Sequence, residues 1–142
     1  MPDITHDDQA VKRLLARRPK IAMVGASDKP ERDSNRVFLY MQRAGYDQLP
    51  VTPAAPVVHG VTSVPDLKAA AGKGYADLVD VFRAADQCVP IVKDAIAVGA
   101  KAIWFQLGVV NPEAIRLATD AGLEVVVDRC IKIEHAHHFG RA

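Results

Sequence analysis

The chain has 142 residues, with 18 Lys and Arg against 17 Asp and Glu, so its formal net charge is +1 at pH 7. This balance argues against a protein held to nucleic acid or acidic lipid by bulk charge, because such binding needs a surplus of surface cations. Hydrophobic residues make up 49% of the chain and charged residues 25%, which is typical of a folded domain. We expect a single domain over residues 1–142.

Cysteine usage and the lack of long apolar stretches bear on the compartment. Cys88 and Cys130 are too few for a disulfide framework, which favours a reducing environment. Residues 1–20 contain no apolar stretch of signal-peptide length, and no other segment approaches a membrane span. We therefore expect a cytoplasmic protein without contact to membranes or nucleic acid, whose oligomeric state the sequence does not define.

The first half of the chain alternates helical patterns with short apolar runs, and glycine or proline marks most boundaries. Gly25 closes the first apolar run, and Asp33 or Ser34 is the expected N-cap of the second helix. In chain order the predicted elements are a helix over Thr5–Arg18, a buried strand over Lys20–Val24, a helix over Ser34–Ala44, a strand over Tyr46–Val51, a turn-rich stretch over Ala54–Val64 and a short helix from Pro65 to Gly72.

The second half of the chain repeats this alternation. Asn111 and Pro112 indicate a helix start, since Asn caps unpaired amides and Pro needs no hydrogen bond there. The predicted elements are a strand over Asp77–Phe82, a helix from near Asp86 to Gly99, a strand over Lys101–Phe105, a helix from Asn111 to Gly122 and a strand over Leu123–Val127. The expected inward positions are Val89, Val92, Ala95 and Ile96 in the first of these helices and Ala114, Leu117, Ala118 and Ala121 in the second.

Five apolar strands that alternate with helices predict parallel pairing and a three-layer α/β/α sandwich with an extra N-terminal helix. The histidine-bearing tail from Ile131 to Ala142 is expected to cover an edge of the sheet, with residues 136–142 frayed. Ligands bind beyond the carboxyl ends of the strands in such sheets. This rule nominates the segments Gly25–Arg36, Thr52–Pro56, Val81–Arg83, Gln106–Val109 and Asp128–Cys130.

The first of these segments predicts an anion site. A buried strand, a glycine turn and a helix N-terminus follow one another, so unpaired amides and the helix dipole point to one place. The alternative interpretation is that Gly25 only makes a tight turn and Ser34 only caps a helix.

Two common nucleotide-binding motifs are absent. Ser27 and Pro30 stand where the dinucleotide fingerprint needs its second and third glycines, and Val51-Thr52-Pro53 offers no acid for a ribose. Gly72-Lys73 is followed by Gly74 and therefore does not form a Walker loop. NAD and ATP in their standard binding modes are disfavoured.

Four segments taken together resemble the small single-domain CoA-binding proteins, a family that is itself similar to the N-terminal domain of the succinyl-CoA synthetase α subunit. The resemblance extends from Pro19 to His135. The segments are Ile21-Ala22-Met23-Val24-Gly25-Ala26-Ser27, Val79-Asp80-Val81-Phe82-Arg83, Ala102-Ile103-Trp104-Phe105-Gln106-Leu107-Gly108-Val109 and Asp128-Arg129-Cys130-Ile131-Lys132-Ile133-Glu134.

The resemblance implies a Rossmann-like domain that binds coenzyme A or an acyl-CoA. By that resemblance the phosphates would be held by Gly25, Ala26 and Ser27 with Ser34, Asn35 and Arg36. The nucleotide would be walled by Pro53, Val81 and Phe82, and the path to the pantetheine arm would be lined by Gln106 and Gly108. This chain departs from the family pattern at Thr52, where Asn is usual, and lacks the Lys often found over Ala54–His59, which weakens the case for recognition of the 3′-phosphate.

Charged residues near these positions admit two interpretations. Lys29, with Arg32 and Arg36, adds positive charge to the segment Gly25–Arg36. Three acids alternate with these cations, so the segment is neutral overall. Arg83 either reaches a phosphate or pairs with Asp80.

We predict a binding module without catalysis of its own and without a metal. The alternative is a CoA-dependent enzyme of acyl transfer or thiol redox chemistry, in which Cys130 is the reactive thiol. A nicotinamide-dependent oxidoreductase is the least favoured function, because the glycines and the ribose acid that it needs are missing.

Overall fold

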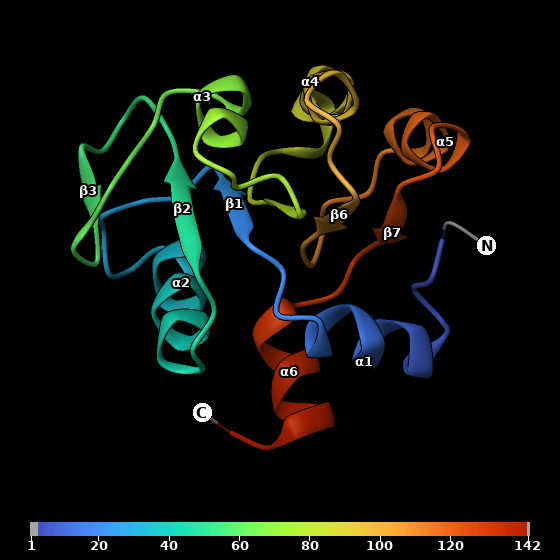
Figure 1. The fold of residues 1–142 in the computed structure, drawn as a ribbon, viewed down its shortest axis with the longest axis horizontal. Helices are drawn as coiled ribbons and strands as arrows, with labels where there is room; N and C mark the ends of the chain where they lie inside the picture. The colour runs from blue at the N-terminus through green and yellow to red at the C-terminus, as the bar shows by residue number, and fades with distance from the viewer. Residues whose placement is uncertain (1–2, 142) are drawn as a thin grey trace.

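The computed structural model of the chain describes residues 3–141, and in it a five-stranded parallel sheet lies between two layers of helices (Figure 1). This confirms the predicted α/β class with a Rossmann-like sheet and an extra N-terminal helix. The strands of the sheet are β1 (Ile21–Val24), β2 (Gln48–Val51), β5 (Leu78–Val81), β6 (Ala102–Phe105) and β7 (Glu124–Val126). The helices are α1 (Asp8–Ala16), α2 (Asp33–Arg43), α3 (Leu67–Gly72), the 3-10 turn η1 (Ala85–Gln87), α4 (Cys88–Ala97), α5 (Pro112–Asp120) and α6 (Ile131–Phe139).

The order of strands creates a crevice at one end of the sheet. The order is β2-β1-β5-β6-β7, and every neighbouring pair is parallel. The chain leaves β1 through α2 toward β2 on one side, and then crosses through α3 to β5 on the other side of β1. The loops that follow β1 and β5 therefore diverge, which is where open α/β sheets bind ligands.

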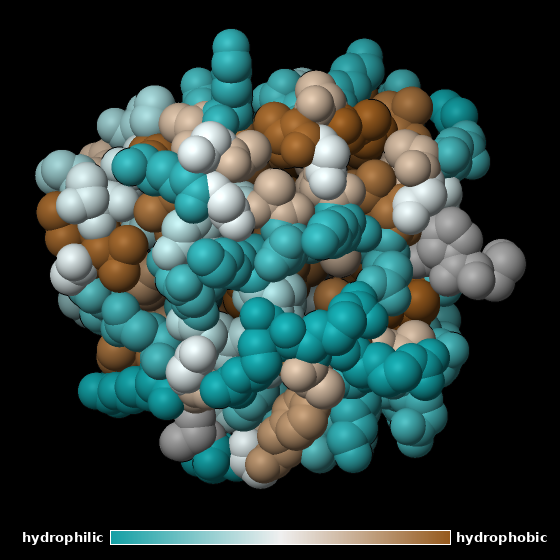
Figure 2. Space-filling view, in the orientation of Figure 1, coloured by the Kyte–Doolittle hydropathy of each residue, from teal (hydrophilic) through white to brown (hydrophobic). Residues whose placement is uncertain are grey.

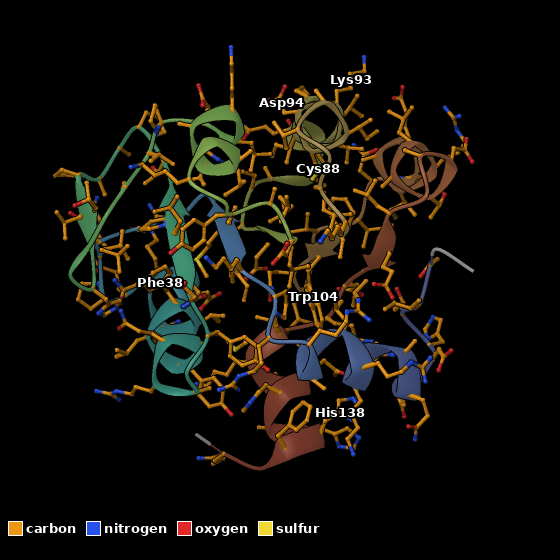
Figure 3. All side chains as sticks on the ribbon, in the orientation of Figure 1. Phe38, Cys88, Lys93, Asp94, Trp104 and His138 are labelled. Carbon is orange, nitrogen blue, oxygen red and sulfur yellow. The ribbon has the colours of Figure 1, made fainter. Side chains whose placement is uncertain are left out.

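Two apolar cores flank the sheet. Helices α1, α2 and α6 cover one face, and α3, α4 and α5 cover the other (Figure 1). Phe38 and Trp104, both fully buried, fill the first core, and Cys88 faces the sheet in the second. Lys93 and Asp94 lie on the outer side of α4 (Figure 3).

The inward face of α4 differs in part from the prediction. Val92 and Ala95 are buried as predicted, but Cys88 takes the third inward position and Ile96 is 38% exposed. Positions 88, 92 and 95 lie on one side of the helix, and Ile96 lies at the border of that side. Figure 2 shows apolar residues gathered over α4 and α5 on this side of the molecule.

Helix α5 begins as predicted. The side chain of Asn111 accepts a hydrogen bond from the Ala114 amide at 3.0 Å, and Pro112 is the first helical residue. Ala114 and Ala118 are buried, whereas Ala121 is exposed because it follows the last helical residue.

The turn-rich stretch before α3 contains a small hairpin that the sequence did not predict. Its strands are β3 (Val57–Val58) and β4 (Val61–Thr62), each too short to show a periodic pattern. The Thr52 amide donates to the Val64 carbonyl at 2.9 Å, which ties the end of the hairpin to β2.

The tail after β7 is the main correction to the prediction. Residues 131–139 form α6, so the expected fraying is wrong over 136–139, and residue 142 lies outside the described residues. Ile131 and His135 are buried, and the ring of His135 lies edge-on to the rings of Tyr40 and Tyr46. The histidine therefore packs as an aromatic core residue, which a pattern of apolar residues does not capture.

The free edge of β7 is covered by the other end of the chain. The Ile4 amide donates to the Val125 carbonyl at 2.9 Å, and the Thr5 hydroxyl accepts from the Val127 amide at 2.9 Å. The prediction that the C-terminal tail covers an edge is thus wrong, because α6 packs on a face of the sheet. Within residues 3–141 no helix is long and apolar enough to cross a membrane.

Two isoleucines of α6 test whether this helix belongs to the core. Ile131→Ala removes a fully buried side chain, so we expect the free energy of unfolding to fall by about 2 to 4 kcal/mol in urea denaturation. Ile133→Ala removes a side chain that is 57% exposed and is the matched control, with an expected change within about 0.5 kcal/mol. Equal small changes for both variants would contradict the packing of α6 described above.

Candidate functional site

Two adjoining pockets open at the carboxyl ends of the strands, around the point where the loops after β1 and β5 diverge. The first has a volume of about 650 Å³ and is built from the loop after β1, the first turn of α2, the loop after β2 and the residues after β5. It is lined by Gly25, Ala26, Ser27, Asp28, Lys29, Glu31, Arg32, Asp33, Ser34, Thr52, Pro53, Ala54, Ala55, Phe82 and Arg83.

Gly25 allows two backbones to meet at the floor of the first pocket. Its φ is +87°, and a Cβ at this position would lie 2.2 Å from the carbonyl oxygen of Phe82. The Gly25 amide donates to Val51 at 3.0 Å and the Phe82 amide donates to Val24 at 2.8 Å, so strand pairing fixes the approach from both sides. Glycine is required here by both its φ and the lack of space.

The N-terminus of α2 forms one wall of this pocket. The N-cap is Arg32, which makes no side-chain capping bond, so the prediction of Asp33 or Ser34 as N-cap is wrong. Asp33 and Ser34 are the first helical residues and both line the pocket. The amides of this first turn have no side-chain cap, and with the helix dipole they favour an anion.

Arg36 holds the loop after β1 together. Its guanidinium donates to the carbonyl oxygens of Pro30 and Glu31, at 3.2 and 2.9 Å, and forms an ion pair with Asp33. These contacts position the loop, and the ion pair neutralises one acid of the pocket wall.

Asn35 supports the loop from below and does not line either pocket. Its side-chain amide donates to the Ser27 carbonyl at 3.0 Å, which leaves its Oδ1 to accept from Nε2 of His59 at 2.9 Å. His59 comes from the hairpin between β3 and β4 and stacks on Phe38 with an interplanar angle of 14°. The hairpin is thereby connected through one buried asparagine to the glycine loop, residues 25–32 between β1 and α2.

Arg83 lies in the wall with an unpaired guanidinium. Within residues 3–141 it has no ion-pair or hydrogen-bond partner, and it lines both pockets. Asp80 is fully buried and binds Gln106 instead, so of the two alternatives for Arg83 the pair with Asp80 does not form. Arg83 is available to an anionic ligand.

The second pocket has a volume of about 470 Å³ and shares three residues, Asp33, Phe82 and Arg83, with the first. It lies between α2, the loops after β5 and β6, and the start of α6. The other residues that line it are Arg36, Val37, Gln106, Leu107, Val109, Cys130, Lys132 and Ile133.

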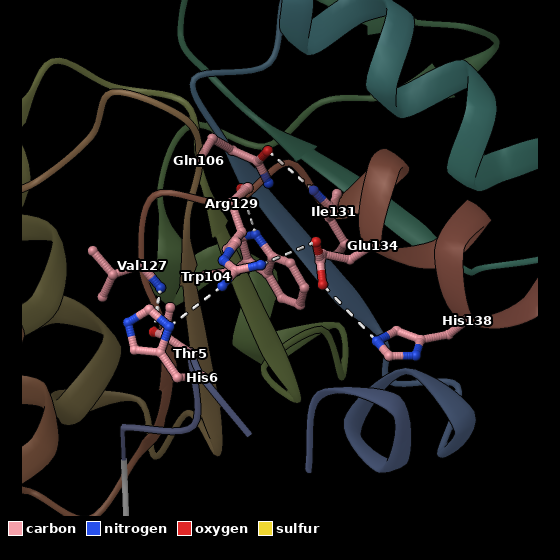
Figure 4. A network of polar contacts seen from close by, with 9 residues as sticks. All are labelled: Thr5, His6, Trp104, Gln106, Val127, Arg129, Ile131, Glu134 and His138. Carbon is pink, nitrogen blue, oxygen red and sulfur yellow. Dashed lines mark hydrogen bonds and ion pairs between the residues drawn. The ribbon is translucent and has the colours of Figure 1, made fainter. Parts of the chain in front are cut away.

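A buried carboxyl fixes the orientation of Gln106 at the base of the second pocket. Nε2 of Gln106 donates to Oδ1 of Asp80 at 2.5 Å, and Oε1 accepts from the Ile131 amide at 3.3 Å (Figure 4 shows the second contact). The amide of Ile131 can only donate, so the side-chain oxygen of Gln106 must face it. Burial raises the pKa of Asp80 from 3.8 to about 7, against the hydrogen bond from Gln106, which lowers it.

The segment that carries Cys130 is anchored on both sides. Nε1 of Trp104 donates to the Arg129 carbonyl at 2.8 Å, and the Arg129 guanidinium lies 3.6 Å from the Glu134 carboxylate (Figure 4). These contacts place Cys130, a half-buried free thiol, in the wall of the second pocket. The alternative function through this thiol stays a prediction.

The structure brings most of the predicted ligand-binding residues to the two pockets. Ten line them, and three do not. Asn35 supports the loop, Val81 is buried within β5, and the amide of Gly108 donates to Asp128 at 2.7 Å. The ten are Gly25, Ala26, Ser27, Lys29, Ser34, Arg36, Pro53, Phe82, Arg83 and Gln106. A role in binding stays a prediction for all thirteen.

Sequence reasoning missed several residues that shape the pockets. His59 and Asp80 act through Asn35 and Gln106, and no spacing in the sequence signals these pairs. Leu107 and Ile133 stand in the second pocket on different elements, 26 residues apart in the chain. Leu107 lies in the segment Gln106–Val109, which the strand-end rule nominated, but it was not singled out, and Ile133 lies outside every nominated segment.

Comparisons with known proteins find similar sequences and similar structures. The sequence profile of a family described as the CoA binding domain matches residues 19–136. An uncharacterized protein of Bacillus subtilis strain 168, YneT, is 39% identical over 126 residues, which cover 89% of this chain and 92% of the relative.

Two solved structures share the fold over almost their whole length. A hypothetical protein from Pyrococcus horikoshii is 37% identical with a TM-score of 0.86, over 99% of this chain and 98% of that chain. A protein from Thermus thermophilus is 31% identical with a TM-score of 0.88, over 94% of this chain and 99% of that chain.

Replacement of Gly25 tests the close approach at the pocket floor. Gly25→Ala adds both strain at a positive φ and a clash with the Phe82 backbone, so we expect a loss of about 3 kcal/mol or more in the free energy of unfolding. Gly74→Ala is the control, since Gly74 has a φ of +89° but no atom within 4 Å of the added Cβ. Its expected loss is about 1 kcal/mol, and equal losses would show that the clash is unimportant.

Asp80→Asn tests the buried carboxyl. Because folding raises the pKa of Asp80 from 3.8 to about 7, its contribution to stability is fully present below the lower value and is lost as the pH rises through the higher one. Asparagine still accepts from Gln106 and cannot ionise. The variant is therefore expected to gain stability relative to wild type, by up to about 4 kcal/mol between about pH 4 and pH 8, in urea denaturation.

The control for this measurement is Asp94→Asn, on the exposed side of α4. It should leave the free energy of unfolding nearly unchanged across the same range. A difference between Asp80→Asn and wild type that does not depend on pH would contradict the burial of an ionisable carboxyl.

Proposed function

This chain belongs to the CoA-binding domain family, and on that premise we propose that it binds coenzyme A or an acyl-CoA at the carboxyl ends of β1 and β5, without catalysis of its own. The observation that carries the proposal is the unpaired Arg83 beside the uncapped N-terminus of α2. A pyrophosphate is the part of the ligand that suits this arrangement, because amides, a helix dipole and a guanidinium all favour a multiple anion.

The charges of the first pocket support recognition by placement rather than by bulk attraction. Arg36 neutralises Asp33, which leaves Lys29, Arg32 and Arg83 facing Asp28 and Glu31. The excess of one positive charge is small for a ligand with several phosphates. Binding should therefore weaken only gradually with salt, unlike binding to nucleic acid, where many counterions are released.

The rest of the ligand fits the same crevice. Pro53 and Phe82 offer flat apolar surface beside the glycine loop for a nucleotide base, and the second pocket continues from the shared wall. Pockets of about 300 to 1,000 Å³ are typical for ligands of this size.

Calorimetric titration with CoA, ADP and NAD tests the proposal. We expect saturable binding of CoA and weaker binding of ADP, since ADP lacks the pantetheine arm. Saturable binding of NAD with no response to any CoA species would overturn the proposal.

Arg83→Gln tests the residue on which the proposal most depends. Loss of a charge-assisted hydrogen bond to a phosphate should weaken CoA binding about tenfold or more, with an unchanged melting temperature because Arg83 has no partner among residues 3–141. Arg43→Gln, an exposed arginine in the last turn of α2, is the control and should leave the affinity unchanged. Equal affinities of the two variants would place the phosphates elsewhere.

A further inference from the structure

We propose that the second pocket takes the acyl end of the ligand, so that this chain selects an acyl-CoA with an apolar acyl group over free CoA. The inference rests on the proposed function and specifies its ligand class. Free CoA ends in a thiol, which would cover little of the apolar surface in this pocket.

The two pockets adjoin, because they share three lining residues. Phe82, Arg83 and Asp33 line both of them, so a ligand with its phosphates beside Arg83 has its next atoms at the entrance of the second pocket. The direction of the ligand follows from this order, because Arg32, Asp33 and Ser34 of the uncapped helix N-terminus all line the first pocket, whereas only Asp33 of these three reaches the second.

Apolar side chains from separate elements form most of the second pocket. Val37 comes from α2, Leu107 and Val109 from the loop after β6, and Ile133 from the first turn of α6. Leu107 is 59% exposed and Ile133 is 57% exposed, so both leave large aliphatic surfaces in water. An acyl chain between them would remove that surface from water, which is the main source of affinity for an apolar group.

Three cations line the second pocket, and Arg83, which has no partner among residues 3–141, is the one that the proposed function assigns to the phosphates. The other two already have partners. Arg36 pairs with Asp33, and Nζ of Lys132 lies 5.6 Å from the centre of the Tyr40 ring. A carboxylate at the end of the acyl group would therefore have to compete for these cations, whereas a methyl group would not. The pocket favours an alkyl over a dicarboxylic acyl group.

Gln106 supplies a polar contact for the thioester carbonyl or for an amide of the pantetheine arm. One hydrogen of its Nε2 is bound to Asp80, and the other has no partner among residues 3–141. Because Asp80 and the Ile131 amide fix the side chain from both ends, Gln106 presents a donor and not an acceptor to the pocket. A carbonyl oxygen is the complementary ligand group.

The test is a calorimetric titration of the full chain, under a reductant, with CoA, acetyl-CoA, butyryl-CoA, hexanoyl-CoA and succinyl-CoA. Each methylene that leaves water should raise the affinity up to about fourfold. Hexanoyl-CoA should therefore bind more tightly than acetyl-CoA by a factor of about ten or more. Butyryl-CoA should bind more tightly than succinyl-CoA, which has the same chain length and a terminal carboxylate.

Three exposed apolar positions provide matched variants. Leu107→Ala and Ile133→Ala should each reduce the affinity ratio of hexanoyl-CoA to CoA to about a third or less, because the removed carbons are those that cover the chain. Val110→Ala is the control, since Val110 is 47% exposed in the same loop but does not line the pocket. Its ratio should equal that of the wild type.

The outcomes separate this inference from the proposed function. Equal affinities for CoA and all acyl-CoAs, or tightest binding of succinyl-CoA, would overturn the acyl pocket while CoA binding stands. A lack of response to every CoA species would overturn the proposed function itself. If Val110→Ala lowers the affinity ratio of hexanoyl-CoA to CoA as much as Leu107→Ala and Ile133→Ala do, the effect does not come from the pocket.

Discussion

The contact between the backbones of Gly25 and Phe82 is the constraint on which the site depends. The chain can leave β1 and β5 side by side only because residue 25 has no Cβ, which would stand 2.2 Å from a carbonyl oxygen. This approach places the glycine loop and Arg83 in one pocket, and the chain then turns into α2. The same two segments thus supply the amides and the guanidinium that an anion would contact.

Buried polar contacts hold the walls around this contact. Asn35 ties the glycine loop to the hairpin through His59, and Gln106 ties β5 to the start of α6 through Asp80. Asp80 carries a cost, because Oδ2 of its buried carboxyl has no hydrogen-bond partner among the described residues. A cost of this kind is common at sites where the geometry of a binding group matters more than stability.

Sequence reasoning predicted the sheet because its strands are mostly apolar and alternate with helical patterns, with glycine or proline at most of the boundaries. It also predicted the glycine loop, since a strand, a tight turn and a helix start occur within a few residues. It failed where the outcome depends on contacts between distant segments. Arg36 and Arg83 look alike in the sequence, yet one is paired within its loop and the other is unpaired. Helix α6 was missed because His135 packs among tyrosines as an aromatic residue.

Nuclear magnetic resonance tests the central claim most directly, because the amide signals of a 15.4 kDa chain can be followed one by one. Titration with CoA is expected to shift the backbone amide signals of Ala26, Ser27 and Ser34 in a saturable way, together with residues of the second pocket. The signals of α4 and α5, which cover the face of the sheet opposite to α2, should stay in place. Saturable shifts confined to that opposite face, or no shift at the glycine loop, would contradict the site proposed for the phosphates.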